Sequence, residues 1–330
     1  MHLMDQKPAS RIIFSLVCLL ILSPLIHSQL DYSFYDTSCP SLTRIVRNGV
    51  WSAMRNETRM AASLLRLHFH DCFVDGCDAS LLLDDSNDII SEKSASPNRN
   101  SVRGYEVIDS IKADVEKACP STVSCADIVT IAAREAVFLS GGPYWFVALG
   151  RRDGTTANRT AANEQLPSPL DDLTTITAKF AAKGLDAKDV VVLSGAHTIG
   201  FAQCFTFKNR LFNFNSSGGP DLELDVSLLK NLQSLCPNNV SSDSNLAPLD
   251  PVTTSRFDNI YYKNLMNSSG LLQSDQALLD DSDTASMVSN YSIYPYLFFR
   301  DFGASMLKMA NIGVLTGGNG EIRTNCRAVN

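Results

Sequence analysis

Eight cysteines, spread from residue 39 to residue 326, constrain the fold of this chain more than any other feature of its sequence. A ninth, Cys18, lies in an apolar N-terminal segment that has the pattern of a cleaved export signal. An even number of cysteines in an exported chain indicates disulfides, here four. Eight cysteines can pair in roughly a hundred ways, so their spacing alone does not assign the bonds. The eight are Cys39, Cys72, Cys77, Cys119, Cys125, Cys204, Cys236 and Cys326.

The N-terminal segment has the parts of a secretory signal peptide. Arg11 supplies a basic flank, residues 12–26 form an apolar run, and Ser28 is a small residue at the expected cleavage point. A run of about 15 residues is short of the roughly 20 that a membrane-spanning helix needs. We therefore expect residues 1–28 to be removed and residues 29–330 to form a single domain. A membrane anchor is the alternative.

Charge and glycosylation motifs fit an extracellular protein. The chain of 330 residues has a formal net charge of −7. An acidic chain is a poor partner for nucleic acid or for an anionic membrane surface. Six Asn-x-Ser/Thr motifs are candidates for glycosylation during export. Their asparagines are Asn56, Asn158, Asn215, Asn239, Asn267 and Asn290.

Apolar residues recur with the period of an α-helix along most of the chain. Alternating strand patterns are scarce, and no long linker divides the sequence; residues 213–220 and 237–248 have the composition of loops. We therefore predict one mainly α domain with two lobes and little β-structure. The segments predicted to be helical are residues 42–50, 61–67, 107–115, 124–140, 173–182, 186–193, 260–266 and 298–309.

Three histidines remain after removal of the signal peptide: His68, His70 and His197. On a helix, Arg66 and His70 lie four residues apart and share a face, with Phe69 beside them. That face would carry a fixed cation, a group that titrates near neutrality and an aromatic wall. The structural alternative is that His70 only satisfies a helix end.

The second histidine site follows two small residues. Gly195 and Ala196 directly precede His197, so a flat group could approach the backbone there. A helix crossing that needs small residues is the alternative. Two imidazoles on separate helices suit a haem held between two lobes, with His197 as axial ligand and the His70 side open for reaction.

Two hydrolase interpretations also use these residues. Three histidines are a known ligand set for catalytic zinc. His68 and His70 are two residues apart, however, and would point to different sides of one helix. A Ser-His-Asp hydrolase is disfavoured because the chain lacks the Gly-x-Ser-x-Gly motif.

Two segments, Arg66–Cys72 and Leu193–Gly200, resemble the distal and proximal signatures of the secreted plant haem peroxidases of class III. The resemblance extends over residues 29–330. It implies a two-lobed helical fold with one haem b between the distal and proximal lobes. It also implies an enzyme that reduces H2O2 and oxidises phenolic donors by one-electron steps, in cell-wall phenolic chemistry, lignification, peroxide removal or stress responses. Shorter matching motifs are Asp78-Ala79-Ser80, Ser124-Cys125-Ala126-Asp127, Gly150-Arg151-Arg152-Asp153 and Ser274-Asp275-Gln276.

The resemblance assigns catalytic roles on the distal side. His70 would take a proton from H2O2 and return it to the departing oxygen, acting as base and then as acid. Arg66 would stabilise the developing negative charge. Asn98 would hold the other nitrogen of His70, with Glu92 behind it, and Phe69 would shield the bound oxygen from bulky donors.

On the proximal side, His197 would ligate the iron and Asp275 would accept its second N–H, which makes the imidazole more electron-donating. The Pro167 carbonyl would accept a hydrogen bond from a phenol at the haem edge. Some relatives carry exposed phenylalanines around that edge. This chain has other residues at what look like those positions, so stacking of an aromatic donor would be weaker here. They are Ser96, Leu170 and Thr206.

The resemblance further implies two Ca²⁺ ions and a definite disulfide pairing. Hard oxygen ligands at close spacing suit Ca²⁺. The distal ion would take the side chains of Asp71, Asp78 and Ser80 and the carbonyls of Val74 and Gly76. The proximal ion would take Thr198, Asp250, Thr253, the Arg256 carbonyl and Asp258. The implied disulfides are Cys39–Cys119, Cys72–Cys77, Cys125–Cys326 and Cys204–Cys236.

The expected setting is the apoplast or cell wall. A monomer is expected because no exposed apolar stripe stands out in the sequence. The serious alternative to an enzyme is a relative without haem that serves as a wall-binding glycoprotein.

Overall fold

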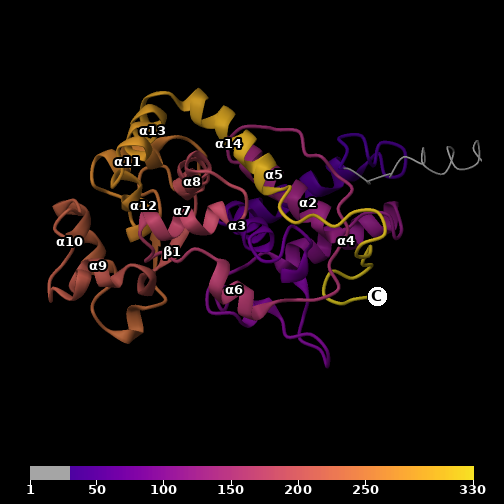
Figure 1. Ribbon diagram of the computed structural model, residues 1–330, viewed down its shortest axis with the longest axis horizontal. Coiled ribbons are helices and arrows are strands. Elements are labelled where there is room, and N and C mark those ends of the chain that lie inside the picture. Colours follow the sequence, from indigo (N-terminus) through magenta and orange to yellow (C-terminus); the bar gives the residue numbers. More distant parts are fainter. Residues whose placement is uncertain (1–29) are drawn as a thin grey trace, which may run out of the picture.

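The computed structural model describes residues 30–330, so the predicted signal peptide and its cleavage point lie outside the described residues. The described part contains thirteen α-helices and a single two-stranded sheet, which confirms the mainly α class (Figure 1). The helices of this part are all too short or too polar to cross a membrane. The α-helices are α2 (Leu42–Asn56), α3 (Met60–Cys72), α4 (Tyr105–Ala118), α5 (Cys125–Leu139), α6 (Arg159–Gln165), α7 (Leu173–Ala181), α8 (Ala187–Ser194), α9 (Lys208–Phe212), α10 (Val226–Leu235), α11 (Ile260–Met266), α12 (Gln273–Gln276), α13 (Ser282–Ile293) and α14 (Pro295–Met309).

Short elements connect these helices. The strands β1 (Phe201–Gln203) and β2 (Leu246–Pro248) pair antiparallel, with Ala202 opposite Ala247. The 3₁₀ turns are η1 (Ser80–Leu82), η2 (Glu92–Ser94), η3 (Gly195–Thr198), η4 (Cys204–Thr206), η5 (Phe214–Ser216), η6 (Val240–Ser242) and η7 (Ala277–Leu279).

Helix α5 is the centre of the N-terminal group of helices. It packs against α2, α3 and α4, and nearly all of its side chains are buried, as expected for a helix that is apolar on every side. Ser124 caps it, accepting a hydrogen bond from the Asp127 backbone N–H over 3.1 Å.

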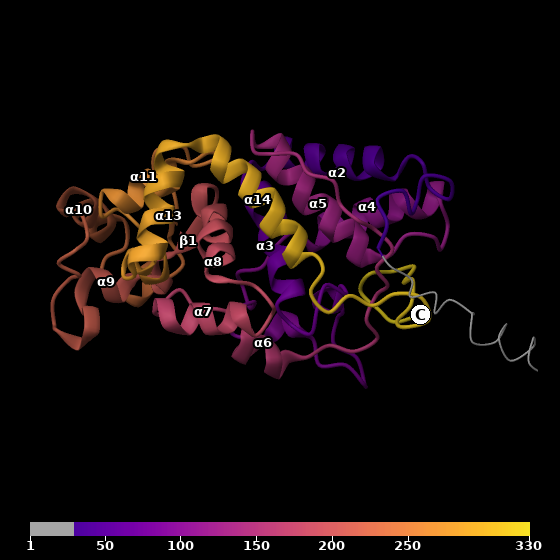
Figure 2. The same cartoon turned by 45° about the horizontal axis from the view of Figure 1, so that its top comes forward.

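The C-terminal group contains α8, α11, α13 and α14, which pack on one another. Figure 2 shows α14 running from this group toward the helices α2 and α5 of the first. A smaller apolar cluster lies under α9, α10 and the sheet, and it includes Phe207, Leu211 and Leu232. The 3₁₀ turn η3, which carries His197, contacts α8 and α11.

Each of the eight segments with helical apolar spacing contains an α-helix, and five further helices escaped prediction. Helices α6, α9 and α12 have seven residues or fewer, too few to show a period. The two segments expected to be loops are mostly irregular, but they contain η5, η6 and β2.

Residues 30–330 contain four disulfides, and they are the pairs that the resemblance implied. Cys125–Cys326 ties the C-terminal segment to the first turn of α5, across 201 residues of sequence. Cys72–Cys77 closes a loop of five residues directly after His70.

Candidate active site

The distal histidine is fixed by an asparagine. His70 lies in the last turn of α3, is 5% exposed, and donates its Nδ1–H to Asn98 Oδ1 over 2.6 Å. The Asn98 amide nitrogen donates in turn to the Glu92 carbonyl over 2.8 Å, so the amide oxygen must face the imidazole. Burial and the charge of Arg66 hold the pKa of His70 well below its usual range. The imidazole is therefore neutral, with a free lone pair on Nε2.

Arg66 lies one turn before His70 on α3. Its guanidinium donates to the Pro97 carbonyl over 2.9 Å and to Ser101 Oγ over 3.2 Å. Burial lowers the pKa of Arg66 to about 10, so the side chain stays cationic at neutral pH. Phe69, beside His70, packs on the Phe73 ring with centroids 4.3 Å apart.

His68 has a different environment. It is 1% exposed, and Nδ1 lies 3.5 Å from the sulfur of Cys72 in the Cys72–Cys77 disulfide. Burial and the charge of Arg151 lower its pKa to about 3, so it stays neutral as a packing residue. Across residues 30–330, no three His, Cys, Asp or Glu side chains come together to hold a metal, and the three-histidine zinc site finds no support.

The proximal histidine is held by a carboxylate. His197 donates its Nδ1–H to Asp275 Oδ1 over 2.6 Å. The same oxygen accepts the Tyr261 hydroxyl over 3.0 Å, and Asp275 Oδ2 accepts the Leu272 backbone N–H over 3.0 Å. Asp275 is thus fixed by three donors. The His197 side chain is 36% exposed, so Nε2 remains open to a ligand.

Gly195 has a packing role. A Cβ at this position would lie 2.4 Å from the Tyr262 hydroxyl oxygen and 2.5 Å from the Phe298 ring. The small residue before His197 is therefore required by the aromatic side chains of α11 and α14. For Gly195, the alternative interpretation is therefore the right one: the glycine allows close packing of neighbouring helices.

The distal and proximal elements touch each other. A Cβ on Gly200, just after η3, would lie 2.8 Å from Cβ of Ala62 in α3. The Arg59 guanidinium lies 5.3 Å from the Phe201 ring centroid. The backbone N–H of Ser274, next to Asp275, donates to the Pro169 carbonyl over 3.1 Å. The loop of Pro167 therefore abuts the proximal side.

Buried oxygens without partners mark the loop after His70. Asp71 Oδ1, Ser80 Oγ and Glu92 Oε2 are buried and have no hydrogen-bond partner. Burial and the charge of Asp78 raise the pKa of Asp71 well above its usual range, and burial raises the pKa of Asp78 as well. Burial also raises the pKa of Glu92 to about 7. Orphaned buried oxygens of this kind are what a hard cation satisfies.

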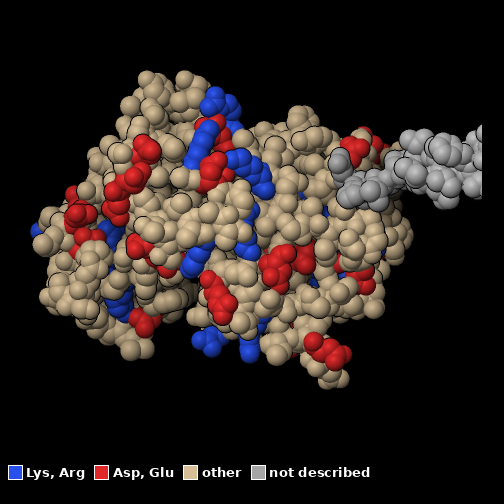
Figure 3. Space-filling model, viewed as in Figure 1, with Lys and Arg blue, Asp and Glu red and all other residues tan. Residues whose placement is uncertain are grey.

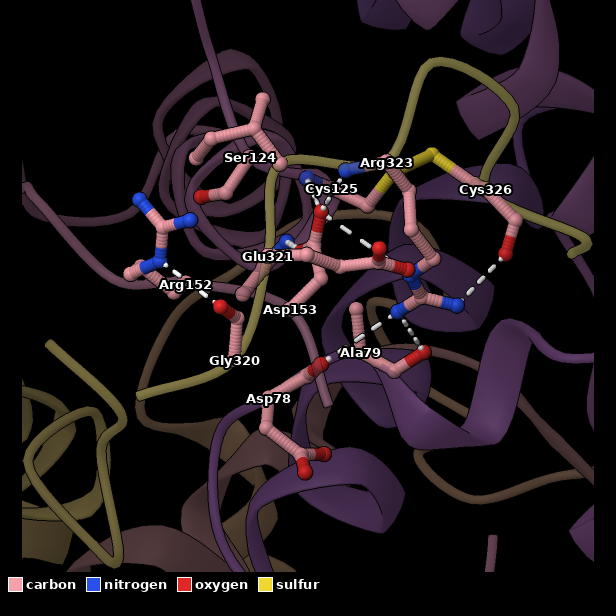
Figure 4. A network of polar contacts seen from close by, with 12 residues as sticks. Asp78, Ala79, Ser124, Cys125, Arg152, Asp153, Gly320, Glu321, Arg323 and Cys326 are labelled. Carbon is pink, nitrogen blue, oxygen red and sulfur yellow. Dashed lines mark hydrogen bonds and ion pairs between the residues drawn. A yellow bond between two sulfur atoms is a disulfide. The ribbon is translucent and has the colours of Figure 1, made fainter. Parts of the chain in front are cut away.

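A polar network behind this loop holds it to the C-terminal segment (Figure 4). The carboxylate of Asp153 accepts the backbone N–H groups of Cys125, Ala126 and Arg323 over 2.9 to 3.1 Å. The fully buried Arg323 guanidinium donates to the Ala79 carbonyl over 2.6 Å and to the Asp78 carbonyl over 3.3 Å. Arg323 therefore fixes the backbone of the loop through its carbonyls.

A second oxygen cluster lies beside His197. Thr198 Oγ1 and Thr253 Oγ1 donate to Asp258 Oδ1 over 3.3 and 3.1 Å. Thr253 Oγ1 also lies 2.9 Å from Asp250 Oδ2. Both Thr198 and Asp250 are fully buried. Hydroxyls and carboxylates this close fit a hard cation, and Arg256 lies in the same loop.

Sequence reasoning missed three residues that shape these sites. Tyr261 reads as one apolar position in the helical stripe of α11, and nothing in its neighbourhood reveals the hydroxyl contact with Asp275. Asp153 lay in a matching motif without an assigned role, and Arg323 had no signal. At the expected donor edge, Leu170 is 47% exposed, and Phe205, next to Thr206, is 56% exposed.

Together, the mainly α fold and two imidazoles with tethered Nδ1 and open Nε2 fit the class of haem-dependent redox enzymes. The chain matches the family model described as peroxidase over residues 46–293. It is 63% identical over 301 residues to Peroxidase 10 of Arabidopsis thaliana, an alignment that covers 91% of this chain and 86% of that protein. It is 54% identical over 324 residues to Peroxidase N of Armoracia rusticana, covering 97% of each. The lignin-forming anionic peroxidase of Nicotiana sylvestris is 50% identical over 322 residues, covering 98% of this chain and 97% of that protein.

The chain belongs to the plant peroxidase family, class III. It is accordingly an oxidoreductase with a haem cofactor that reduces H2O2 and oxidises phenolic donors.

Proposed function

We propose that His70, Asn98 and Arg66 form the acid–base site of this peroxidase and that His197, backed by Asp275, holds the haem iron. The residues fit the group, because His197 offers an open Nε2 and the distal side offers a neutral imidazole beside a fixed cation. When bound, the haem supplies the redox chemistry that cleaves the peroxide O–O bond. The other steps belong to the protein.

His70 moves the proton. Because Asn98 holds Nδ1–H, the lone pair on Nε2 accepts a proton from H2O2 and returns it to the departing oxygen as water forms. The low pKa of His70 keeps this nitrogen unprotonated before peroxide arrives. Arg66, anchored by Pro97 and Ser101, places positive charge where negative charge develops.

Phe69 and Pro167 control the approach of donors. The Phe69 ring, packed on Phe73, shields the distal pocket and leaves donors at the haem edge. There the Pro167 carbonyl accepts the hydrogen bond of a phenol hydroxyl. Pro167 is partly exposed, as this role requires.

In this proposal the protein also binds two Ca²⁺ ions. The distal ion takes the unpartnered oxygens of Asp71 and Ser80, together with Asp78 and the carbonyls of Val74 and Gly76. The proximal ion lies in the second oxygen cluster, with ligands from Thr198, Asp250, Thr253, Arg256 and Asp258. Because Thr198 directly follows His197, loss of that ion should disturb the iron.

We further propose that residues 1–28 are a signal peptide and that the mature domain, residues 29–330, acts as a monomer in the apoplast or cell wall. The six sequons are then open to glycosylation. Cell-wall phenolics are the substrates proposed for it, with lignification, peroxide removal and stress responses as the processes served.

The observation that carries the catalytic assignment is the 2.6 Å hydrogen bond between His70 and Asn98, which leaves Nε2 free. The test compares rapid mixing of H2O2 with the wild type, His70→Ala and Arg66→Leu. Loss of a general base costs about 10²–10⁴ in rate, and Arg66→Leu removes the positive charge that stabilises the departing oxygen. Both variants should therefore bind haem yet change their spectrum far more slowly. An unchanged reaction of His70→Ala with peroxide would overturn the assignment.

A further inference from the structure

A cavity lined by aromatic rings opens on the surface beside α14. Its volume is about 600 Å³, and it lies between the helix and the segment after α5. Figure 1 shows this segment and α14 on the same face. The lining residues that matter here are Tyr32, Tyr144, Trp145, Phe146, Phe299 and Arg300.

Three rings of this cavity are exposed, and Tyr144 among them is held by its neighbours. Phe146 is 71% exposed, Tyr32 60% and Tyr144 42%. Tyr144 makes edge contacts with Phe138 and Phe146, with centroids 5.4 and 5.8 Å apart. The Arg134 guanidinium lies 4.4 Å from the Tyr144 centroid. Exposed aromatic rings on a protein surface can stack with the aromatic ring of a ligand.

The charges around the cavity leave it open to a neutral ring. Arg300 is the one charged lining residue, and it pairs with Asp301 over 2.7 Å. Nearby on α14, Lys308 pairs with Asp186 and Asp189. Figure 3 shows acidic side chains among the basic ones over α14, as these ion pairs require, so the positive charge near the cavity is partly neutralised.

A continuous column of buried rings connects this cavity to the proximal histidine. Trp145, 7% exposed at the cavity wall, contacts Phe302 with centroids 6.0 Å apart. Phe302 contacts Phe298 at 5.6 Å, and Phe298 contacts Tyr262 at 5.0 Å. Tyr262 contacts Tyr261 at 5.1 Å.

The column ends at the site of the redox chemistry. The Tyr261 and His197 rings lie 6.1 Å apart between centroids, and the Tyr261 hydroxyl donates to Asp275, the carboxylate that holds His197. From Phe302 to Tyr261, every ring in the column is 1% exposed or less. Tryptophan and tyrosine can give up an electron, and the two phenylalanines provide contact between them.

We propose that the cavity is a second donor site, where a phenolic ring borne on a polymer too bulky for the haem edge gives up an electron through the column from Trp145 to Tyr261. The proposal rests on the peroxidase function above, which supplies H2O2 as oxidant. Each phenol loses one electron to the column and one proton to water, and becomes a phenoxyl radical. Two phenols thus balance one H2O2 reduced to two waters.

The test compares a free phenol, 4-hydroxycinnamate, with the same phenol grafted to dextran, using the haem-loaded enzyme. Phe146→Arg closes the exposed wall, and Trp145→Phe removes the oxidisable ring at the start of the column while keeping an aromatic side chain. Each should lower the ratio of kcat/KM for the grafted phenol to that for the free phenol by about tenfold. Tyr296→Phe is the matched control, because Tyr296 is 65% exposed on α14 but lies outside the cavity and the column.

A second readout does not depend on turnover. With H2O2 and a nitroso spin trap but no donor, peptide mass spectrometry should find adducts on Tyr144 or Trp145 in the wild type. Trp145→Phe should remove the adduct on Tyr144. An unchanged ratio in Phe146→Arg, or adducts absent from the cavity residues, would overturn the proposal. Failure of the wild type to oxidise the free phenol would instead refute the peroxidase function itself.

Discussion

Glu92 should make the stability of the calcium-depleted protein fall as the pH rises. Its carboxyl is fully buried, and its pKa is raised by burial from the usual 4.5 to about 7. Between these values the folded state keeps a proton that the unfolded state has released. The free energy of unfolding is therefore highest below about pH 4.5 and falls until about pH 7.

The size of this effect follows from the two pKa values. They are about 2.5 pH units apart, which corresponds to about 3 kcal/mol for the single carboxyl group. Asp71 and Asp78, whose pKa values are also raised, act in the same direction. Glu92→Gln removes only the contribution of Glu92, because the amide has the same shape and does not titrate.

The assay is urea unfolding of the calcium-depleted protein at pH 5 and pH 7.5, with disulfides intact. Between these two pH values the wild type should lose about 2 kcal/mol more than Glu92→Gln, because they do not span the whole titration. Saturating Ca²⁺ should shrink this difference, since a nearby cation favours the ionised carboxylates. Equal losses in both proteins, or a difference that Ca²⁺ leaves unchanged, would refute the reasoning.

Three further predictions concern residues that hold the sites together. Asp275→Ala removes the acceptor of His197 Nδ1–H, and we expect haem to leave about 10–100-fold faster, measured by transfer to an apo-globin; an unchanged rate would contradict the role. Asn98→Ala leaves the Nδ1–H of His70 without its partner, and peroxide should react about tenfold to a hundredfold more slowly in rapid mixing. An unchanged rate would show that this hydrogen bond does not matter for the reaction. Arg323→Met leaves the Asp153 carboxylate and the Asp78 and Ala79 carbonyls without their cation, which should cost about 3–5 kcal/mol in urea unfolding and weaken binding at the proposed distal Ca²⁺ site. Unchanged stability together with unchanged Ca²⁺ binding would contradict the network of Figure 4.

The fold class and the long helices were predictable because apolar periodicity is a local property. Helix α5 is one example: Ser124 marks its start, and Gly141 follows its end. The short helices α9 and α12 were not predictable, since four or five residues show no period. Tertiary packing decides whether such short segments are helical.

The parts of the candidate site that lie within one short sequence motif were predictable. Arg66 and His70 share a helix face at four-residue spacing, as the sequence indicated. The contacts of Tyr261 and Arg323 join segments 14 and 244 residues apart, to Asp275 and Ala79, and no local pattern encodes them. Gly195 is a case in which a local motif suggested the wrong reason for a residue. The sequence suggested room for a flat group, but the missing side chain makes room for the rings of Tyr262 and Phe298.

The central claim is a haem held by His197 opposite a distal base, His70. The most direct measurement is the visible absorption spectrum of the purified protein before and after one equivalent of H2O2, followed by a phenol. The account predicts a Soret band that loses intensity with peroxide and recovers with the phenol in the wild type, and a band in His70→Ala that stays nearly unchanged over the same time. A protein that remains colourless after refolding with haem and Ca²⁺, or a His70→Ala variant that responds as fast as the wild type, would contradict it.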